Sequence, residues 1–182
     1  MRIFVGIELT ERQRAAAECM ARCARKSMPG KYVEPRNYHV TIAYIGETDE
    51  AVRDRAMRAL EAAARASAGA APWCALSAAG FFRRADKAIL YCGVREEPGL
   101  LKTAQCVREA LREDGVPFDP TPFVPHITLG RNVRIDEWTL AGLIPEACET
   151  EIAALTLFES VRVDGVLRYT PLYRAPVERK RV

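Results

Sequence analysis

The sequence predicts one domain of mixed helices and strands, built from two similar halves around a shared core. Short apolar segments typical of strands alternate with longer segments whose apolar residues recur at helical spacing. A pattern of His, apolar, Thr, apolar occurs twice, at His39 and at His126, 87 positions apart, and each copy follows a predicted helix. No linker separates the halves, and 182 residues suit one domain over 1–182 or two small lobes with a common core. These features favour a degenerate internal duplication related by a pseudo-twofold axis.

The first half alternates strands with helices that begin after good capping residues. The predicted elements are, in order, a strand at 2–8, a helix at 11–26 capped by Thr10, the first motif strand at 38–45, and a helix capped by Thr48 or Asp49 that runs to about residue 66. The outer face of the second helix is rich in Arg and Glu, which indicates a solvated surface.

The second half repeats this alternation and adds a closing hairpin. The predicted elements are strands at 73–79 and 88–94 joined by residues 80–84, a helix at 98–113, the second motif strand at 126–131, a weaker helix at 136–147, and strands at 151–160 and 167–172 around a turn at Asp164 and Gly165. Prolines between 117 and 125 mark a loop that leads into the second motif. The basic tail, Arg179 to Arg181, is expected to be frayed and solvated.

Composition and charge are those of an ordinary globular protein. The formal net charge is +3, with a pI of about 8.6, which permits a nucleic-acid substrate without indicating a non-specific polyanion binder. The apolar start is too short for a signal peptide, and no segment is long enough to span a membrane. The cysteines form no C-x-x-C pair, which favours buried thiols in a reducing compartment. We therefore expect a cytoplasmic protein, monomeric and without a membrane partner.

Each motif puts one histidine and one threonine on the same face of a strand, because successive side chains point to opposite faces. The apolar motif residues then face the core, while His39 and Thr41, and again His126 and Thr128, face outward together. Two imidazoles at one site can supply the base and the acid for metal-free phosphoryl transfer near neutral pH. A pseudo-twofold arrangement would bring the two motif strands face to face across a cleft. The alternative is that both histidines are structural residues of a core or edge strand, which form hydrogen bonds within the fold and take no part in a reaction.

Other chemistries lack their usual motifs in this chain. Two histidines without a nearby set of carboxylate or cysteine ligands do not make a zinc or di-metal site. A Gly-rich phosphate loop followed by Lys and Ser or Thr is also missing from the sequence. We therefore expect no metal and no other cofactor.

At its two motifs the chain resembles the 2H phosphoesterase superfamily, and within it the RNA 2′,3′-cyclic phosphodiesterases, also called 2′-5′ RNA ligases. The resemblance extends over almost the whole chain and is carried by segments 2–7, 37–46, 80–81, 88–94, 123–131 and 168–172. It implies a bilobal α+β fold with two antiparallel sheets lining a central cleft and helices packed outside. It also implies hydrolysis of an RNA 2′,3′-cyclic phosphate end, on tRNA fragments for example, to a 2′-phosphate end, with reversible 2′-5′ ligation as a related activity.

The resemblance assigns functional roles to five positions, which are His39, Thr41, His126, Thr128 and Arg131. We interpret His126 as the base that activates water and His39 as the acid that protonates the ribose 3′-oxygen, although the symmetry of the motifs does not fix this order. The threonine hydroxyls would donate to phosphate oxygens, and the guanidinium of Arg131 would add charge. Strict alternation turns Arg131 away from Thr128, so its role requires a bulge at Gly130 or a strand end there.

Aromatic residues are candidates to stack on a base or ribose of the substrate. They are Phe4, Phe81, Phe82 and Phe123, and packing in the core is at least as good an explanation for each. Arg83 and Arg84, beside Phe81, are consistent with an RNA strand leaving the cleft, and equally with exposed hairpin charges. Two other functions stay open: a phosphodiesterase for small cyclic nucleotides or cyclic ADP-ribose phosphate, and a non-catalytic module that binds RNA ends.

Overall fold

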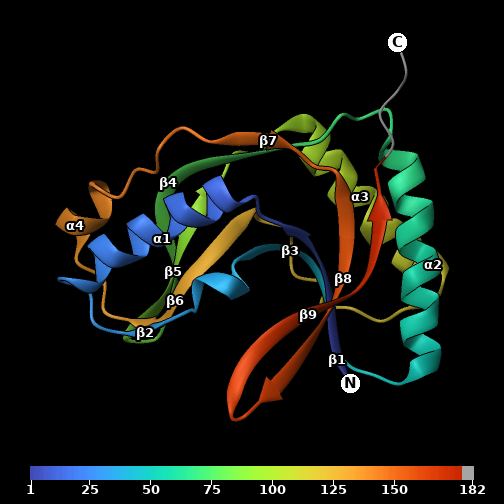
Figure 1. The fold of residues 1–182 in the computed structure, drawn as a ribbon, viewed down its shortest axis with the longest axis horizontal. Helices are drawn as coiled ribbons and strands as arrows, with labels where there is room; N and C mark the ends of the chain where they lie inside the picture. The colour runs from blue at the N-terminus through green and yellow to red at the C-terminus, as the bar shows by residue number, and fades with distance from the viewer. Residues whose placement is uncertain (178–182) are drawn as a thin grey trace.

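The strands of the computed structural model, which describes residues 1–177, form one nine-stranded antiparallel sheet (Figure 1). They are β1 (Arg2–Glu8), β2 (Lys31–Tyr32), β3 (His39–Glu47), β4 (Trp73–Arg84), β5 (Lys87–Val94), β6 (His126–Val133), β7 (Glu149–Glu151), β8 (Ala154–Val163) and β9 (Val166–Pro176). The helices are α1 (Glu11–Arg25), α2 (Glu50–Ser67), α3 (Pro98–Glu113) and α4 (Glu137–Ala141), with a 3₁₀ turn at Pro35–Asn37. The prediction for Arg179 to Arg181 lies outside the described residues.

The two motif strands occupy the centre of the sheet. The strand order is β7-β4-β5-β6-β3-β1-β8-β9, with β2 paired to β6, and Val40 of β3 pairs with Ile127 of β6. Each motif strand pairs, on the side away from the centre, with a strand that comes before it in the chain. Strand β1 pairs with β3 and is connected to it through α1, and β5 pairs with β6 and is connected to it through α3. The α+β class is confirmed, and the symmetrical order is what a duplication predicts. The duplication itself stays a prediction.

One detail of the predicted fold differs. We expected two antiparallel sheets on opposite sides of a cleft, whereas β3 and β6 pair with each other and join both halves into one sheet. The two motif strands are therefore joined at Val40 and Ile127 rather than belonging to separate sheets. The pairing satisfies backbone groups of both motif strands that a cleft between them would leave open.

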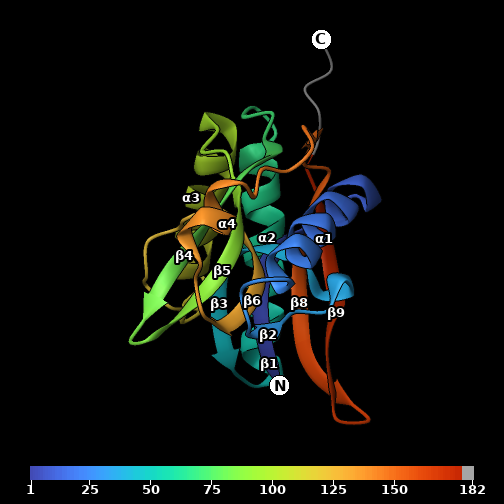
Figure 2. The ribbon, with the colours of Figure 1, turned by 90° about the vertical axis from the view of Figure 1, so that its left-hand side faces the viewer.

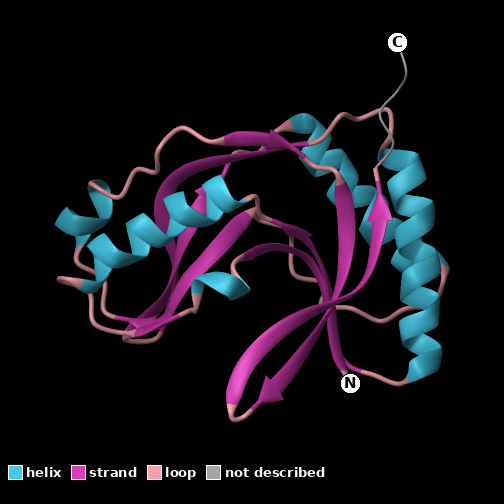
Figure 3. Ribbon diagram, viewed as in Figure 1, coloured by secondary structure: helices cyan, strands magenta, loops and turns pink. Residues whose placement is uncertain are grey.

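The helices cover the sheet from outside, and each connecting helix packs on the other half. Helix α1 leaves β1 but contacts β6, and α3 leaves β5 but contacts β3 and α2 (Figure 2). Helix α2 also packs against the outer strands β8 and β9 (Figure 3). This exchange explains why the two halves share one hydrophobic core. Among residues 1–177, no helix has both the length and the apolar character needed to span a lipid bilayer.

Local sequence explains where the helices begin and which faces they bury. Thr10 and Gln13 form a capping box at the start of α1, and the Asp49 side chain accepts from the Val52 amide at the start of α2. The buried helix faces are rich in alanine, which lets the helices approach the sheet closely. The residues they pack with include the apolar members of both motifs, Val40, Ile42, Ile127 and Leu129, which are at most 2% exposed.

Several element boundaries differ from the predicted ones. Strand β4 continues through residues 80–84, and the chain reverses at Ala85, whose φ is +53°. Glycine at position 80 lets β4 lie close to Tyr91 of the paired strand β5, because a side chain there would collide with the Tyr91 ring. Helix α4 is much shorter than the predicted 136–147, since Gly142 caps it. Cys19 and Cys23 are exposed, so the prediction of buried thiols is wrong for them.

Candidate active site

Antiparallel pairing of the motif strands sets four polar side chains on one surface. Val40 and Ile127 are the paired residues where the two motif strands meet, and the antiparallel direction of the strands brings His39 toward Thr128 and Thr41 toward His126. In a regular antiparallel pair, residues placed as His39 and His126 are relative to Val40 and Ile127 are diagonal neighbours, whose side-chain origins lie roughly 7–8 Å apart. That spacing leaves room for one phosphate group between the two rings.

The ring of His39 is held in one orientation. Its Nδ1 lies 2.7 Å from the backbone carbonyl oxygen of Asn37, and its Nε2 lies 2.8 Å from the hydroxyl of Thr41. The carbonyl can only accept, so Nδ1 carries the proton and, in the neutral ring, Nε2 accepts from the Thr41 hydroxyl. The rings of Phe4 and Tyr169 lie 4.7 and 4.9 Å away between centroids and hold the imidazole from two sides.

His126 repeats the same arrangement in the other half. Its Nδ1 lies 2.6 Å from the carbonyl oxygen of Val124, again two residues earlier in the chain, so the same tautomer is fixed. The rings of Phe82 and Tyr91 lie 5.0 and 5.3 Å from it. Its Nε2 has no hydrogen-bond partner within residues 1–177, which is the one clear difference from His39.

Both histidines are less basic in the ligand-free site than in water. Burial lowers the pKa of His39 to about 4; the Asn37 carbonyl partly opposes this decrease, and the positive charges of His126 and Arg131 add to it. The pKa of His126 is also lowered, chiefly by burial, with the Val124 carbonyl opposing and Arg131 adding to the decrease. A bound phosphate anion would favour the protonated rings and raise both pKa values.

A β-bulge after each motif threonine decides which later residues reach this surface. The pairing of β6 with β5 passes from Thr128 to Gly130 and skips Leu129, so Leu129 and Gly130 are both buried and Arg131 turns back to the face of Thr128. The predicted condition for Arg131 is therefore met. The pairing of β3 with β1 skips Ile42 in the same way, and Tyr44 returns to the face of Thr41.

The histidines open into a groove with two halves. The first half, a cavity of about 640 Å³, is lined by His39, Phe4, Asn37, Tyr169, Arg2 and Arg162, among others. The second half, of about 580 Å³, is lined by His126, Phe81, Phe82, Phe123, Arg83 and Arg84, among others. Thr41, Tyr44, Thr128 and Arg131 line both halves, so they mark the junction. Each half has the size of a small-ligand pocket.

The predicted stacking residues divide between the two halves. Phe4 is only 3% exposed and packs against His39, so most of its ring is already covered. Phe81 and Phe123 line the second half, where Arg83 lies 5.3 Å above the ring of Phe81. Their stacking on a base stays a prediction. Arg108 also lines this half, but it donates to the carbonyls of Pro120 and Thr121 and so holds the loop before His126.

Three residues of the site were not found from the sequence. Asn37 supplies the carbonyl for His39, while its side chain donates to the Leu167 carbonyl and accepts from the Tyr169 amide, which ties the closing hairpin to the motif. Tyr169 faces His39 from β9, a contact between residues 130 positions apart that only folding creates. Tyr44 could have been found from the sequence, because it follows Thr41 by three positions, as Arg131 follows Thr128. Within residues 1–177, His, Cys, Asp and Glu side chains nowhere gather in a group of three that could hold a metal ion.

Known proteins resemble this chain in sequence and in fold. A relative from Geobacillus stearothermophilus, named RNA 2′,3′-cyclic phosphodiesterase, is 31% identical over 176 residues, which are 95% of this chain and 53% of that protein. This chain therefore spans about half the length of that relative. The crystal structure of Escherichia coli LigT complexed with 3′-AMP superposes with a TM-score of 0.72 at 28% identity, over 97% of this chain and 96% of that one.

A second solved structure matches in fold. The crystal structure of TT0787 of Thermus thermophilus has a TM-score of 0.80 at 24% identity, and the match covers both chains completely. The model of the 2′-5′ RNA ligase superfamily matches residues 10–167, a range that includes both motifs and the bulges behind them. The chain belongs to the 2′-5′ RNA ligase superfamily.

Proposed function

We propose that this protein hydrolyses RNA 2′,3′-cyclic phosphate ends to 2′-phosphate ends, with His39 and His126 as a metal-independent acid–base pair. The observation that carries the proposal is that two adjacent strands, paired at Val40 and Ile127, bring both His-Thr pairs to one groove, with Arg131 at its junction. The relatives named for this activity support the same reaction class.

The reaction needs one proton removed and one proton delivered. A water oxygen attacks phosphorus as the base takes its proton, the bond from phosphorus to the 3′-oxygen breaks, and the acid protonates that oxygen. The product is a 2′-phosphomonoester beside a free 3′-hydroxyl, and the two imidazoles have exchanged protonation states, which solvent restores. Because each Nδ1 is bound to a backbone carbonyl, each Nε2 is the atom that exchanges protons with the substrate.

We assign the base to His126 and the acid to His39. The Nε2 of His126, which no group within residues 1–177 contacts by a hydrogen bond, supports this order, since the Nε2 of His39 is bonded to the Thr41 hydroxyl. The low pKa of His39 opposes it, because the acid must enter the reaction protonated. The assignment therefore requires the phosphate anion to raise the pKa of His39 well above about 4 when it binds.

The remaining groups at the junction stabilise charge on the phosphate. Negative charge grows on the non-bridging oxygens as the pentacovalent state forms, and donors already fixed in place stabilise that state without reorganising. Thr128 and Arg131 face this position from β6. Thr41 donates to His39 in the free site and becomes available to phosphate once His39 is protonated at Nε2.

The second half of the groove favours RNA over a free mononucleotide. Phe81 and Phe123 offer faces for stacking, and Arg83 and Arg84 supply positive charge near the end of the β4–β5 hairpin. A small cyclic nucleotide would leave these groups unused. The proposal therefore predicts a higher kcat/KM for a cyclic-phosphate oligonucleotide than for a nucleoside 2′,3′-cyclic phosphate.

The presence of two nucleoside-sized halves also favours 2′-5′ joining as a second activity. A ribose 5′-hydroxyl in the place of water would attack phosphorus, the 3′-oxygen would leave, and a 2′-5′ phosphodiester would form without ATP. The base and acid keep the same roles as in hydrolysis and exchange them when a 2′-5′ linkage is opened.

The test is phosphorus NMR of a cyclic-phosphate oligonucleotide incubated with the wild-type protein in excess chelator. The expected product is a 2′-phosphate beside a 3′-hydroxyl. A 3′-phosphate product, or activity abolished by the chelator, would contradict the proposal. Tight binding of a 2′-phosphate end without any turnover would instead establish a non-catalytic RNA-end-binding module.

A further inference from the structure

Tyr44 occupies the position in the first motif that Arg131 occupies in the second. Each residue follows its motif threonine by three positions, and in each strand the bulge skips the residue directly after that threonine. The outcome is the same on both strands, namely an outward threonine, two buried residues and an outward long side chain. Without the bulges, alternation would turn both long side chains into the core.

The surroundings of Tyr44 direct it to the junction of the groove. Tyr44 lines both halves, as Arg131 does, and 43% of it is exposed. Its carbonyl accepts from the Asp119 amide at 2.8 Å, which fixes its backbone to the loop before the second motif. Burial raises the pKa of Tyr169 and the nearby Tyr44 adds to that increase, while both residues line the His39 half of the groove.

The hydroxyl of Tyr44, like those of Tyr38, Tyr91 and Tyr169, has no hydrogen-bond partner among residues 1–177, whereas Tyr32 donates to the Met28 carbonyl and Tyr173 to Glu61. A phenol is a neutral donor that does not ionise near neutral pH. Tyr44 lines the junction of the groove together with Arg131, Thr41 and Thr128. An anion held there would be contacted by a cation from β6 and by a phenolic donor from β3.

We infer that Tyr44 is a substrate-contacting residue whose hydroxyl donates to a non-bridging oxygen of the phosphate, opposite the guanidinium of Arg131. The inference rests on the proposed function for the identity of the anion. It explains why β3 carries a bulge at the same place as β6, since the bulge is what returns position 44 to the groove. Tyr44 thus completes a symmetrical set of donors, one hydroxyl and one longer side chain from each motif strand.

The experiment compares Tyr44→Phe with the wild-type protein in two assays. The first is kcat/KM for a cyclic-phosphate oligonucleotide, and the second is calorimetric binding of adenosine 2′-monophosphate and of inorganic phosphate. We expect Tyr44→Phe to lower kcat/KM by about 10- to 100-fold, the range for losing one hydrogen bond to a charged group. We also expect weaker binding of both phosphate ligands, with an unchanged thermal midpoint.

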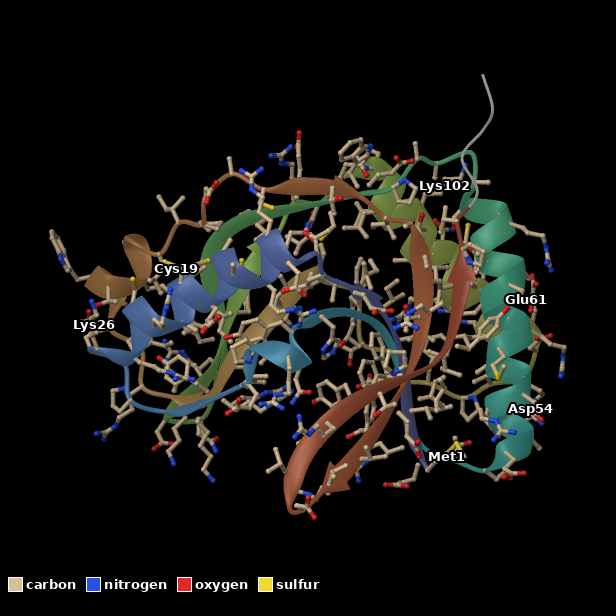
Figure 4. The ribbon with its side chains drawn as sticks, in the orientation of Figure 1. Met1, Cys19, Lys26, Asp54, Glu61 and Lys102 are labelled. Carbon is tan, nitrogen blue, oxygen red and sulfur yellow. The ribbon has the colours of Figure 1, made fainter. Side chains whose placement is uncertain are left out.

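Tyr173→Phe is the matched control, because it removes a hydroxyl that donates to Glu61 on the outer helix α2 (Figure 4). It should leave kcat/KM and both affinities unchanged. Wild-type rates and affinities in Tyr44→Phe would overturn the inference, as would weaker binding of the nucleotide with unchanged binding of inorganic phosphate. If the wild-type protein does not turn over the oligonucleotide, the proposed function fails, and the comparison of phosphate affinities still decides the role of Tyr44.

Discussion

Val40 of the first motif lies directly opposite Ile127 of the second in the antiparallel pair at the centre of the sheet. Both side chains are fully buried, so this pair joins the two halves of the sheet and also belongs to the common hydrophobic core. This pair brings together the two strands that carry His39 with Thr41 and His126 with Thr128, and all four side chains line the same groove. A shift of one residue would turn one motif's histidine into the core, so the hydrophobic pattern of the motifs also protects the geometry of the site.

Replacing either histidine by alanine should lower turnover by about 100-fold or more, the usual loss for a general acid or base. The measurement is the initial rate of 2′-phosphate formation by His39→Ala and His126→Ala at saturating substrate. Because each ring is half-buried against aromatic side chains, the thermal midpoint of each variant must be checked as well. A folded variant with the wild-type rate would remove that histidine from the mechanism.

A substrate with a better leaving group should identify the acid. In a cyclic phosphate whose 3′-oxygen is replaced by sulfur, the thiolate leaves without protonation, since a thiol has a pKa of about 8.5. We expect His39→Ala to recover most of its activity on this substrate and His126→Ala to recover none. Recovery of His126→Ala instead would exchange the two roles and agree with the low pKa of His39 in the free site.

The depressed pKa of His39 should make folding less favourable in mild acid. Its pKa falls from 6.5 to about 4, so between these values the unfolded chain binds more protons than the folded one. The free energy of unfolding should therefore be fully retained above pH 6.5 and fall as the pH drops from 6.5 toward 4, by at most roughly 3 kcal/mol from this residue. Urea denaturation at about pH 7.5 and about pH 5, on either side of the unperturbed histidine pKa, measures the effect.

His39→Gln is the control for this pH dependence, because glutamine keeps a polar side chain but does not titrate. The variant should lose less stability than the wild type over the same pH range. Saturating inorganic phosphate should also reduce the loss in the wild type, since the anion favours the protonated ring. An identical pH dependence in both proteins would contradict a depressed pKa at His39.

Arg131 should be required for transition-state stabilisation. We expect Arg131→Ala to lower kcat by about 10²- to 10³-fold, as for the loss of one oxyanion donor, and Arg131→Lys to recover only part of it because lysine lacks the planar fork. Arg134→Ala is the matched control, since Arg134 follows the same strand but does not line the groove. Equal rates for Arg131→Ala and Arg134→Ala would exclude a role for Arg131 in the reaction.

Asn37 should stabilise the fold and position His39. Its side chain is 5% exposed and binds the Leu167 carbonyl and the Tyr169 amide, so Asn37→Ala leaves two backbone groups without their partner. We expect a loss of about 1–3 kcal/mol in the free energy of unfolding, measured with urea, together with a lower kcat. Gln105→Ala, which removes an amide from an exposed pair with Glu109 on α3, should change neither.

Much of the site could be predicted from the sequence because its parts repeat. The His-x-Thr-x pattern singled out both histidines and both threonines, which line the groove, and strand alternation correctly separated them from the buried Val40 and Ile127. The same alternation could not place Arg131 or Tyr44. Their orientation depends on bulges, and a bulge arises from how one strand pairs with the next rather than from the strand's own pattern.

The sequence by itself determined the order of the main strands and helices, the capping of α1 and α2, and the pairing of a histidine with a threonine on each motif strand, because these depend on local periodicity and capping chemistry. Only the tertiary structure decided that the motif strands are neighbours in one sheet, that each histidine is fixed by a carbonyl two residues earlier, and that Tyr169 and Phe82 hold the rings. The strand pairing and the ring contacts join residues far apart in the chain. Burial, register and the loss of solvent around the imidazoles exist only once the two halves have packed together.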